Sequence, residues 1–244
     1  MASLMFYEKP VELDKRVHSK TRFINEGRKY AFARNTNSVI LSGVEFSDAG
    51  KEFPVVFVSG SEDKVVPVAL LGLKNSENLF VDASGDWLGR YIPAFVRRYP
   101  FALAEVEDGL RVCIDSACGA LQEKEGEPLF DDEGNNSPFL DSVLTFLREF
   151  QQEHQRTESF VKKLQELELL KPLNASVKLP DGEQLALQGL LVVDEPKLLE
   201  LEDKAALSLF RSGELGWIYT HLASIVNLGR LADRVSQTQA DLAD

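Results

Sequence analysis

The sequence predicts an α+β fold, with a mostly antiparallel β part that holds one short helix, followed by a mostly helical part. Three observations lead to this prediction. Runs rich in β-branched and aromatic residues, separated by turn residues, fill residues 53–115. Apolar residues then recur at helical spacing from Ser137 to the proline at 172. A pair of strand-like runs at 173–193 is inserted before the last helices.

The strands of the first part are predicted from composition and turn residues. Single strands are expected at 53–60, 65–73 and 78–83. Pro67 lacks an N–H group, so the strand at 65–73 is expected either at a sheet edge or with the proline at its start. Runs 101–106 and 110–115 form a hairpin that turns at Glu107, Asp108 and Gly109.

Two earlier segments and one helix complete this part. Residues 21–33 hold one strand, after an irregular arm. Residues 35–50 hold either a strand and a turn or a helix that opens near Ser42 and partly buries Val44, Phe46 and Ala49. A short helix is expected from Ile92 to Tyr99, with Pro93 in its first turn and Pro100 as its stop.

The helical part has recognisable start and stop signals. Ser137 is the expected N-cap of the long helix, with Pro138 at its first position. The hairpin within 173–193 turns at Pro180, Asp181 and Gly182. Three helices follow: a short one capped by Asp194, one over 204–214 that Gly213 ends, and one over 215–235.

These elements suggest one integrated unit with two halves. Residues 1–118 form the β-rich half, and residues 119–137 form an acidic surface loop that marks the internal boundary. Residues 138–235 form the helical half, with its hairpin at 173–193. Residues 236–244 are expected to be a frayed tail.

Composition limits the classes of function. The 244 residues include 39 acidic and 27 basic ones, for a formal net charge of −12, which argues against general nucleic-acid binding. No apolar run approaches the roughly 20 residues of a transmembrane helix. The first residues lack the pattern of a signal peptide, so a soluble, cytoplasmic protein is expected. The oligomeric state stays open.

Residues that could carry chemistry are few and scattered. Cys113 and Cys118 are expected to be reduced, with Cys113 buried, and a local redox pair is the alternative. The three histidines have no metal-site spacing, so no metal is predicted. Nucleotide-binding loops and a nucleophile elbow are also absent from the sequence. We therefore predict no cofactor, name no catalytic residue, and favour a non-enzyme.

The segment WLGRYIPAFVRRYPF, residues 87–101, is the first candidate site because it concentrates arginine and aromatic residues in an acidic chain. A structural interpretation packs Phe95 and Tyr99 and leaves the arginines at a helix end. A functional interpretation lets arginine bind a small anion while an aromatic ring stacks on it. The candidate ligand-binding residues are Trp87, Arg90, Tyr91, Arg97, Arg98 and, on the last helix, His221.

Several long phrases also resemble the bacterial SapC family. They are FYEKPVELD, ALLGLKNSENLFVDASGDW, RYIPAFVRRYPF, VCIDSAC, EGEPLFDDEG and RSGELGWIYTHLASIVNLGRLADR, in that order along the chain. The resemblance implies an association with the paracrystalline surface layer, or an accessory role beside a modification or uptake system. Members are also labelled peptide transporter permeases, which the absence of a spanning segment contradicts. The resemblance carries over no catalytic residue.

Three functions are thus to be distinguished. The first is a non-catalytic module that binds a partner protein, a peptide or a small acid through the 87–101 segment. The second is an enzyme whose site forms only in the fold. Its candidate residues are Arg90, Arg97, Arg98, Cys113, Tyr219 and His221. The third is a component of the surface layer.

Overall fold

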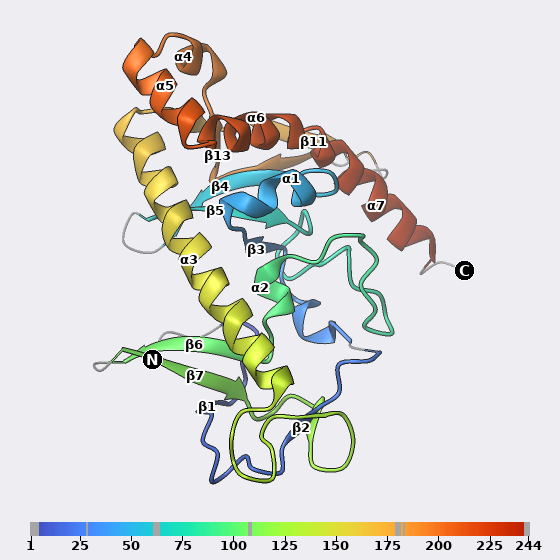
Figure 1. The fold of residues 1–244 in the computed structure, drawn as a ribbon. Helices are drawn as coiled ribbons and strands as arrows, with labels where there is room; N and C mark the ends of the chain where they lie inside the picture. Colours follow the sequence, from blue (N-terminus) through green and yellow to red (C-terminus); the bar gives the residue numbers. More distant parts are fainter. Residues whose placement is uncertain are drawn as a thin grey trace.

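The computed structural model describes residues 5–27, 29–60, 64–106, 109–178, 182 and 184–241. It confirms the α+β fold, with antiparallel sheets first and helices mostly afterwards (Figure 1). Strands β4 and β5 and helices α6 and α7 lie toward one end of the molecule, and the β6–β7 hairpin lies toward the other. Helix α3 runs between the two ends.

The main sheet has five strands in the order β10-β13-β4-β5-β3, and all its pairings are antiparallel. Its N-terminal strands are β3 (Ser38–Ile40), β4 (Val55–Ser59) and β5 (Val65–Leu70). Their apolar composition is explained by burial, because residues 55–57 are fully inaccessible to solvent. The strands predicted at 53–60 and 65–73 are therefore confirmed, with shorter bounds.

Pro67 occupies a different place from the one predicted. It is the third residue of β5, which has β4 on one side and β3 on the other, so it lies neither on an edge strand nor at the strand's start. The carbonyl of Pro67 accepts a hydrogen bond from the Leu41 N–H, just past the end of β3. The missing N–H group therefore faces the side where β3 has already ended, and no ladder bond to β4 is lost.

Three other local expectations need correction. Residues 78–83 form no strand, only a bridge between Val81 and Trp87, because the Asp82 carboxylate accepts the Asp86 N–H and stabilises a turn. Helix α2 spans only Ala94–Arg97, with Pro93 before it. In residues 35–50 a strand and a helix both form, since β3 is followed by a 3-10 turn at Gly43–Glu45 and by α1 (Phe46–Ala49).

The other end of the molecule is built on two small sheets. Strands β6 (Phe101–Val106) and β7 (Gly109–Asp115) form the predicted hairpin, and β1 (Pro10–Glu12) pairs with β7. The predicted turn residues Glu107 and Asp108 lie outside the described residues. The second sheet places β2 (Arg22–Phe23) between β8 (Leu121–Gln122) and β9 (Glu127–Pro128). Residues 119–137 thus contain two strands, and they bury Leu129 and Phe130.

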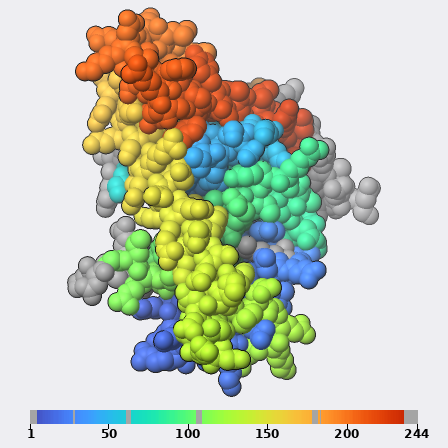
Figure 2. Space-filling model, in the orientation of Figure 1, coloured from blue at the N-terminus to red at the C-terminus, as the bar shows by residue number. Residues whose placement is uncertain are grey.

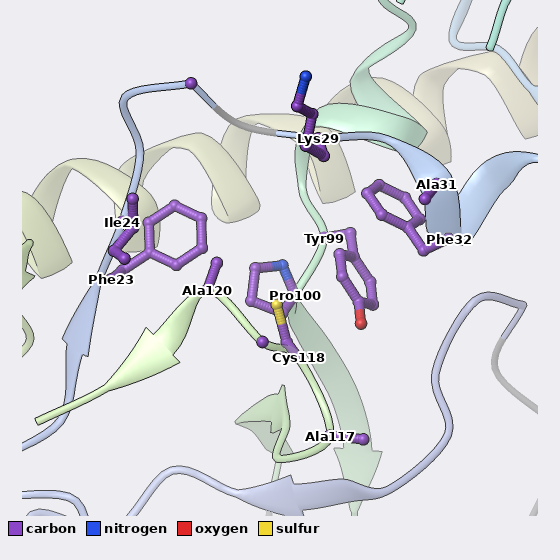
Figure 3. A pocket seen from close by; sticks show the side chains of 12 residues that line it. Phe23, Ile24, Lys29, Ala31, Phe32, Tyr99, Pro100, Ala117, Cys118 and Ala120 are labelled. Atoms are coloured by element: carbon purple, nitrogen blue, oxygen red, sulfur yellow. The ribbon is translucent and has the colours of Figure 1, made fainter. Parts of the chain in front are cut away.

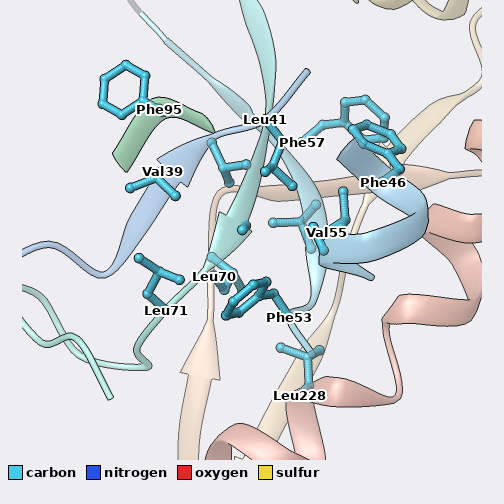
Figure 4. Close-up of a cluster of buried hydrophobic side chains, with 14 of the residues drawn as sticks. Val39, Leu41, Phe46, Phe53, Val55, Phe57, Leu70, Leu71, Phe95 and Leu228 are labelled. Carbon is cyan, nitrogen blue, oxygen red and sulfur yellow. The ribbon is translucent and has the colours of Figure 1, made fainter. Parts of the chain in front are cut away.

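Helix α3 (Pro138–Glu166) contributes to both apolar cores of the protein. The Ser137 hydroxyl accepts the Leu140 N–H, as the sequence predicts. Leu140 and Leu147 pack in a smaller core with the β6–β7 hairpin, whereas Phe160 and Leu164 pack in the larger core around the main sheet. Figure 4 shows part of the larger core, from Val39 and Phe57 to Leu228. In the space-filling view α3 covers the front of the molecule along much of its length (Figure 2).

Only the middle of the predicted hairpin region, residues 173–193, pairs with itself. Strands β11 (Ala175–Lys178) and β12 (Gln184–Leu187) form the hairpin, and its turn residues Pro180 and Asp181 are outside the described residues. Strands β10 (Leu170–Pro172) and β13 (Leu190–Val193) instead join the main sheet, where β13 pairs with β4. The helical half therefore supplies two strands to the sheet of the first half.

The last helices also depart from expectation. They are α4 (Glu195–Leu199), α5 (Asp203–Arg211), α6 (Glu214–Ser224) and α7 (Asn227–Asp241). Asp194 is the N-cap residue of α4, as predicted, but its carboxylate pairs with Lys171 at 2.9 Å and forms no side-chain capping hydrogen bond. The helix predicted at 215–235 is two helices, because the Asn227 amide donates to the Gly50 and Phe53 carbonyls and fixes the break. No helix in the described ranges is long and apolar enough to cross a bilayer.

One glycine allows α6 to approach the 3-10 turn closely. A Cβ atom at Gly43 would overlap the indole of Trp217, and the Gly43 N–H donates to Thr157 Oγ1 at 2.8 Å. We expect Gly43→Ala to lower the free energy of unfolding by about 2 kcal/mol in urea titrations. Gly229→Ala, on an open helix face, should stabilise by about 0.5–1 kcal/mol. Equal effects would contradict the assigned close contact.

Candidate functional site

A cavity of about 240 Å³ lies between α2, β2, β6 and the first turns of α3, and we call it the arginine pocket. The sequence elements that form it meet because Tyr99 and Phe101 continue from α2 directly into β6. Among the described residues, two arginines and no acidic residue line this pocket. The lining residues are Phe23, Asn25, Arg97, Arg98, Tyr99, Phe101, Phe139, Ser142, Val143 and Phe146.

Three phenylalanines form one continuous wall of the arginine pocket. The rings of Phe23 and Phe139 are stacked, with centroids 5.6 Å apart and an angle of 18° between the planes. Phe101 meets Phe23 edge to face at 5.6 Å and lies 6.2 Å from Phe139. Such a wall suits the flat apolar body of a small ligand.

The two arginines are held against aromatic faces. The guanidinium carbon of Arg97 lies 5.3 Å from the ring centre of Phe146, and its Nε donates to the Ile92 carbonyl at 2.9 Å. The Arg98 guanidinium carbon lies 4.1 Å from the ring centre of Phe95 and 5.0 Å from that of Phe150. These contacts fix both positive charges at the α2–α3 junction.

The side chain of Arg98 has few polar contacts. Its side chain forms no hydrogen bond or ion pair with any described residue, and its Nε is buried. Burial lowers the pKa of Arg98, while nearby Tyr7 acts in the opposite direction. A guanidinium nevertheless stays charged in proteins, so Arg98 carries a positive charge that no carboxylate among the described residues pairs with.

Trp87, Arg90 and Tyr91 lie outside the arginine pocket. The indole N–H of Trp87 donates to the Tyr91 carbonyl at 2.9 Å, and its ring packs on Phe80 in the larger core. The Tyr91 hydroxyl donates to the buried Glu45 carboxylate at 2.8 Å, which also accepts the Ala94 N–H. Burial and the Glu45 charge both raise the pKa of Tyr91. These contacts hold the approach to α2 in place.

Arg90 borders a separate hollow with several charged neighbours. Its backbone N–H donates to the Glu52 carboxylate at 2.8 Å, and the hollow is also lined by Asp48 and Lys51. Its side chain is exposed. Arg90 is therefore a matched control for experiments on the two pocket arginines.

His221 lies in the larger core, on α6 against the main sheet, with none of its surface exposed. Its Nδ1 is 2.7 Å from the Val55 carbonyl, and its Nε2 accepts the Val193 N–H at 3.1 Å. The proton must therefore reside on Nδ1. Burial lowers the pKa of His221 to about 4, and the hydrogen bond to Val55 opposes this only in part. The structure does not bring His221 to the arginines.

A second cavity, of about 370 Å³, lies on the other side of Tyr99, and we call it the cysteine pocket (Figure 3). Cys118 lines it beside Pro100 and Tyr99, and Lys29 stands at its edge, where it pairs with Asp86 at 2.6 Å. The Tyr99 hydroxyl donates to Asp115 at 3.0 Å. Burial, Cys118 and Asp115 all raise the pKa of Tyr99.

The two cysteines are free thiols. Cys113 is half-buried on β7, not buried as predicted. Side chains alternate between the two faces of a sheet, and it is the next residue, Ile114, that packs in the smaller core. Burial raises the pKa of Cys113, and the Glu12 charge adds to this effect. Within the described ranges no group of three or more His, Cys, Asp or Glu side chains could hold a metal ion.

Sequence reasoning missed most of the arginine pocket. Phe139, Val143 and Phe146 follow the helical period of α3, and such a period predicts burial without distinguishing a packed core from a cavity wall. Phe23 lies on a two-residue strand whose neighbours are distant in sequence, and Asn25 lies just after that strand. Only the arginine pair carried a detectable signal, an unusual local charge beside aromatic residues.

A family model described as SapC matches residues 13–231 of the chain. No curated protein and no solved structure matches it. The match covers the smaller core, most of the larger core, all of α3 and the residues that line both cavities.

Proposed function

The chain belongs to the SapC family, and from this premise we propose that it is a non-catalytic binding protein for a small aromatic or apolar acid, held in the arginine pocket. The proposal rests on one observation. Two arginines and a wall of phenylalanines line the same cavity, and no carboxylate is among its described lining residues. Such a cavity offers charge-assisted hydrogen bonds to an anion and apolar contact to its body.

The size of the cavity narrows the ligand class. About 240 Å³ is slightly below the usual range of drug-sized ligand sites, which favours a compact acid with one ring. Asn25 and Ser142 add neutral polar groups that could orient a carboxylate or a ring substituent. We also propose that the protein acts in the cytoplasm beside a modification or uptake system. Cell fractionation would separate this role from that of a surface-layer component.

The enzyme alternative is less well supported by the positions of its candidate residues. His221 is sealed in the larger core, and Tyr219 is 41% exposed on α6. Cys113 lies on β7, and it lines neither the arginine pocket nor the cysteine pocket. The candidate base and nucleophile therefore do not converge on Arg97 and Arg98, as acid–base catalysis at that site would require.

Benzoate is a suitable probe because it combines one ring with one carboxylate. We expect isothermal titration calorimetry to detect its binding to the wild type. Arg97→Met and Arg98→Met should each weaken binding about tenfold or more, since each removes a charge-assisted hydrogen-bond donor. Both variants keep an unbranched apolar stem, so the aromatic contacts of the helix junction are largely retained.

Two controls make the result specific. Arg90→Met changes an exposed arginine outside the pocket and should alter benzoate affinity by less than about twofold. Benzyl alcohol, which lacks the carboxylate, should bind more weakly and respond little to either pocket variant. The proposal fails if benzoate does not bind, or if Arg97→Met and Arg98→Met leave its affinity unchanged.

A further inference from the structure

Another hollow, of about 470 Å³, lies between strand β12 and the end of β5, and we call it the strand groove. One wall is formed by residues 185–188, and the other wall includes Leu70 and residues 72–75. Asn37 and Leu190 complete the lining. The strand groove shares no described lining residue with the arginine pocket or the cysteine pocket, so it is a separate site.

The groove runs along an open edge of β12. Leu185 and Leu187 are half-buried on one face of this strand, and Ala186 is exposed on the other face. All three residues line the groove, whereas none of its described lining residues comes from β11, the strand paired with β12. The groove therefore lies at the edge of β12 that faces away from β11.

Backbone groups along this edge have no strand to pair with. In an antiparallel pair, the N–H and C=O groups of alternate residues point away from the partner strand. Among the described strands β12 pairs with β11 alone, and beyond that pair no described residue forms a backbone hydrogen bond with residues 184–188. The edge thus presents donors and acceptors in the arrangement that another strand would satisfy.

The side chains of the groove also suit a peptide. Asn37, Asn75 and Gln188 each carry a carboxamide, which offers a donor and an acceptor as a peptide bond does. Lys74 supplies a positive charge, and no acid is among the described lining residues. Apolar contact for the side chains of a bound strand comes from five leucines, namely Leu70, Leu73, Leu185, Leu187 and Leu190.

Local hydrogen bonds fix the wall opposite β12. The Asn37 carbonyl accepts the Leu71 N–H at 2.7 Å. The Glu77 carboxylate accepts the N–H groups of Leu73 and Lys74, at 3.0 and 3.1 Å. Because this wall is already ordered, a ligand would lose little affinity to rearranging it.

We infer that the strand groove binds an extended peptide segment of a partner protein, which adds to β12 as a further strand and places an acidic side chain near Lys74. Main-chain hydrogen bonds give affinity in this mode of recognition, and contacts to alternate side chains give specificity. The charge of Lys74 selects an acidic segment, which the other charges of a chain with net charge −12 would repel. This interaction goes beyond the binding of an organic acid in the arginine pocket.

A six-residue peptide with capped ends tests this inference. It carries fluorescein, and its valines alternate with threonine and glutamate, so that it favours an extended chain. Fluorescence anisotropy should show saturable binding to the wild type. The same peptide with N-methyl groups on its interior amides lacks the main-chain donors and should bind at least tenfold more weakly. In hydrogen exchange followed by NMR, the unmodified peptide should slow exchange at alternate amides of residues 184–187.

A charge reversal at Lys74 makes the test specific to the groove. Lys74 is exposed, so Lys74→Glu should fold normally, weaken binding of the glutamate peptide about fivefold and strengthen binding of a peptide with lysine in its place. Lys162→Glu is the control, because Lys162 is 77% exposed on α3 and does not line the groove, and it should change either affinity by less than about twofold.

Three results would overturn the inference. They are no binding of the glutamate peptide, equal binding of its N-methylated form, and a peptide preference that Lys74→Glu leaves unchanged. Sedimentation of the wild type addresses a different occupant, since a dimer that Lys74→Glu dissociates would assign the edge of β12 to a second copy of the chain and reject a partner peptide. None of these results bears on benzoate binding, because the two sites share no described lining residue.

Discussion

Replacing Asp115 with asparagine is expected to lower the free energy of unfolding by about 3–4 kcal/mol. The Asp115 carboxylate is fully buried and accepts hydrogen bonds from the backbone N–H groups of Glu8, Lys9 and Ala117 and from the Tyr99 hydroxyl. An asparagine would direct an NH₂ group at some of these donors and leave them unpaired. Each buried donor without a partner costs about 1–3 kcal/mol.

The effect of this substitution should also be local and dependent on pH. Burial raises the pKa of Asp115, but its hydrogen bonds outweigh burial and leave the pKa lowered. The stability it contributes is therefore complete above about pH 4 and is lost as the pH falls through the folded-state pKa. Glu8 donates to one oxygen of Asp115 and Lys9 to the other, and asparagine keeps only one of them. Hydrogen exchange of at least one of these two amides should therefore accelerate in the variant.

Asp131→Asn is the matched control for Asp115→Asn. Asp131 also accepts two backbone N–H groups, from Glu133 at 2.9 Å and Asn135 at 2.8 Å, but in an exposed loop. Water can replace those bonds, so urea denaturation should show a loss below about 1 kcal/mol. Similar losses in the two variants, or unchanged exchange at Glu8 and Lys9, would contradict the role assigned to Asp115.

Acidification from pH 6.5 to pH 4 is expected to remove about 3 kcal/mol of stability through His221 alone. The pKa of His221 is about 4 in the folded protein and near 6.5 in an unfolded chain. The unfolded state therefore binds the proton first as the pH falls. The stability from the neutral ring is complete above about pH 6.5 and declines progressively toward pH 4.

His221→Gln isolates this contribution, because the titrating carboxylates are the same in both proteins. We expect the variant to be less stable than the wild type at pH 7.5 by about 2 kcal/mol, since one of the Val55 and Val193 hydrogen bonds is lost. The difference should shrink as the pH falls to 4. A difference that is constant with pH in urea titrations would exclude a buried neutral His221.

Local signals predicted the parts of the fold that depend on near neighbours in sequence. The β6–β7 hairpin follows from two alternating runs around a tight turn, and α3 follows from Ser137, Pro138 and a long helical period. The pairing of β13 with β4 could not be predicted, because no local pattern indicates which distant strand a short apolar run will join. The break between α6 and α7 depends on Asn227, whose acceptors Gly50 and Phe53 are equally distant.

Of the residues that line the arginine pocket, the sequence pointed only to the two arginines. Arg97 and Arg98 stand out in sequence because arginine pairs beside aromatic residues are unusual in an acidic chain. Trp87 and Tyr91 share that local signal but serve the packing around Glu45. The walls of the pocket require β2, β6 and α3 to meet, and side-chain periodicity cannot tell a filled core from an open cavity.

The two cores described above share α3 as a common wall, and this has a consequence for cooperativity. If the smaller core opened by itself, Leu140 and Leu147 would become exposed while Phe160 and Leu164 still held the rest of the same helix. A continuous helix of 29 residues loses much of its support when half of its apolar face is hydrated. We therefore infer that opening either core weakens the other, so that neither half of the chain is a separate folding unit.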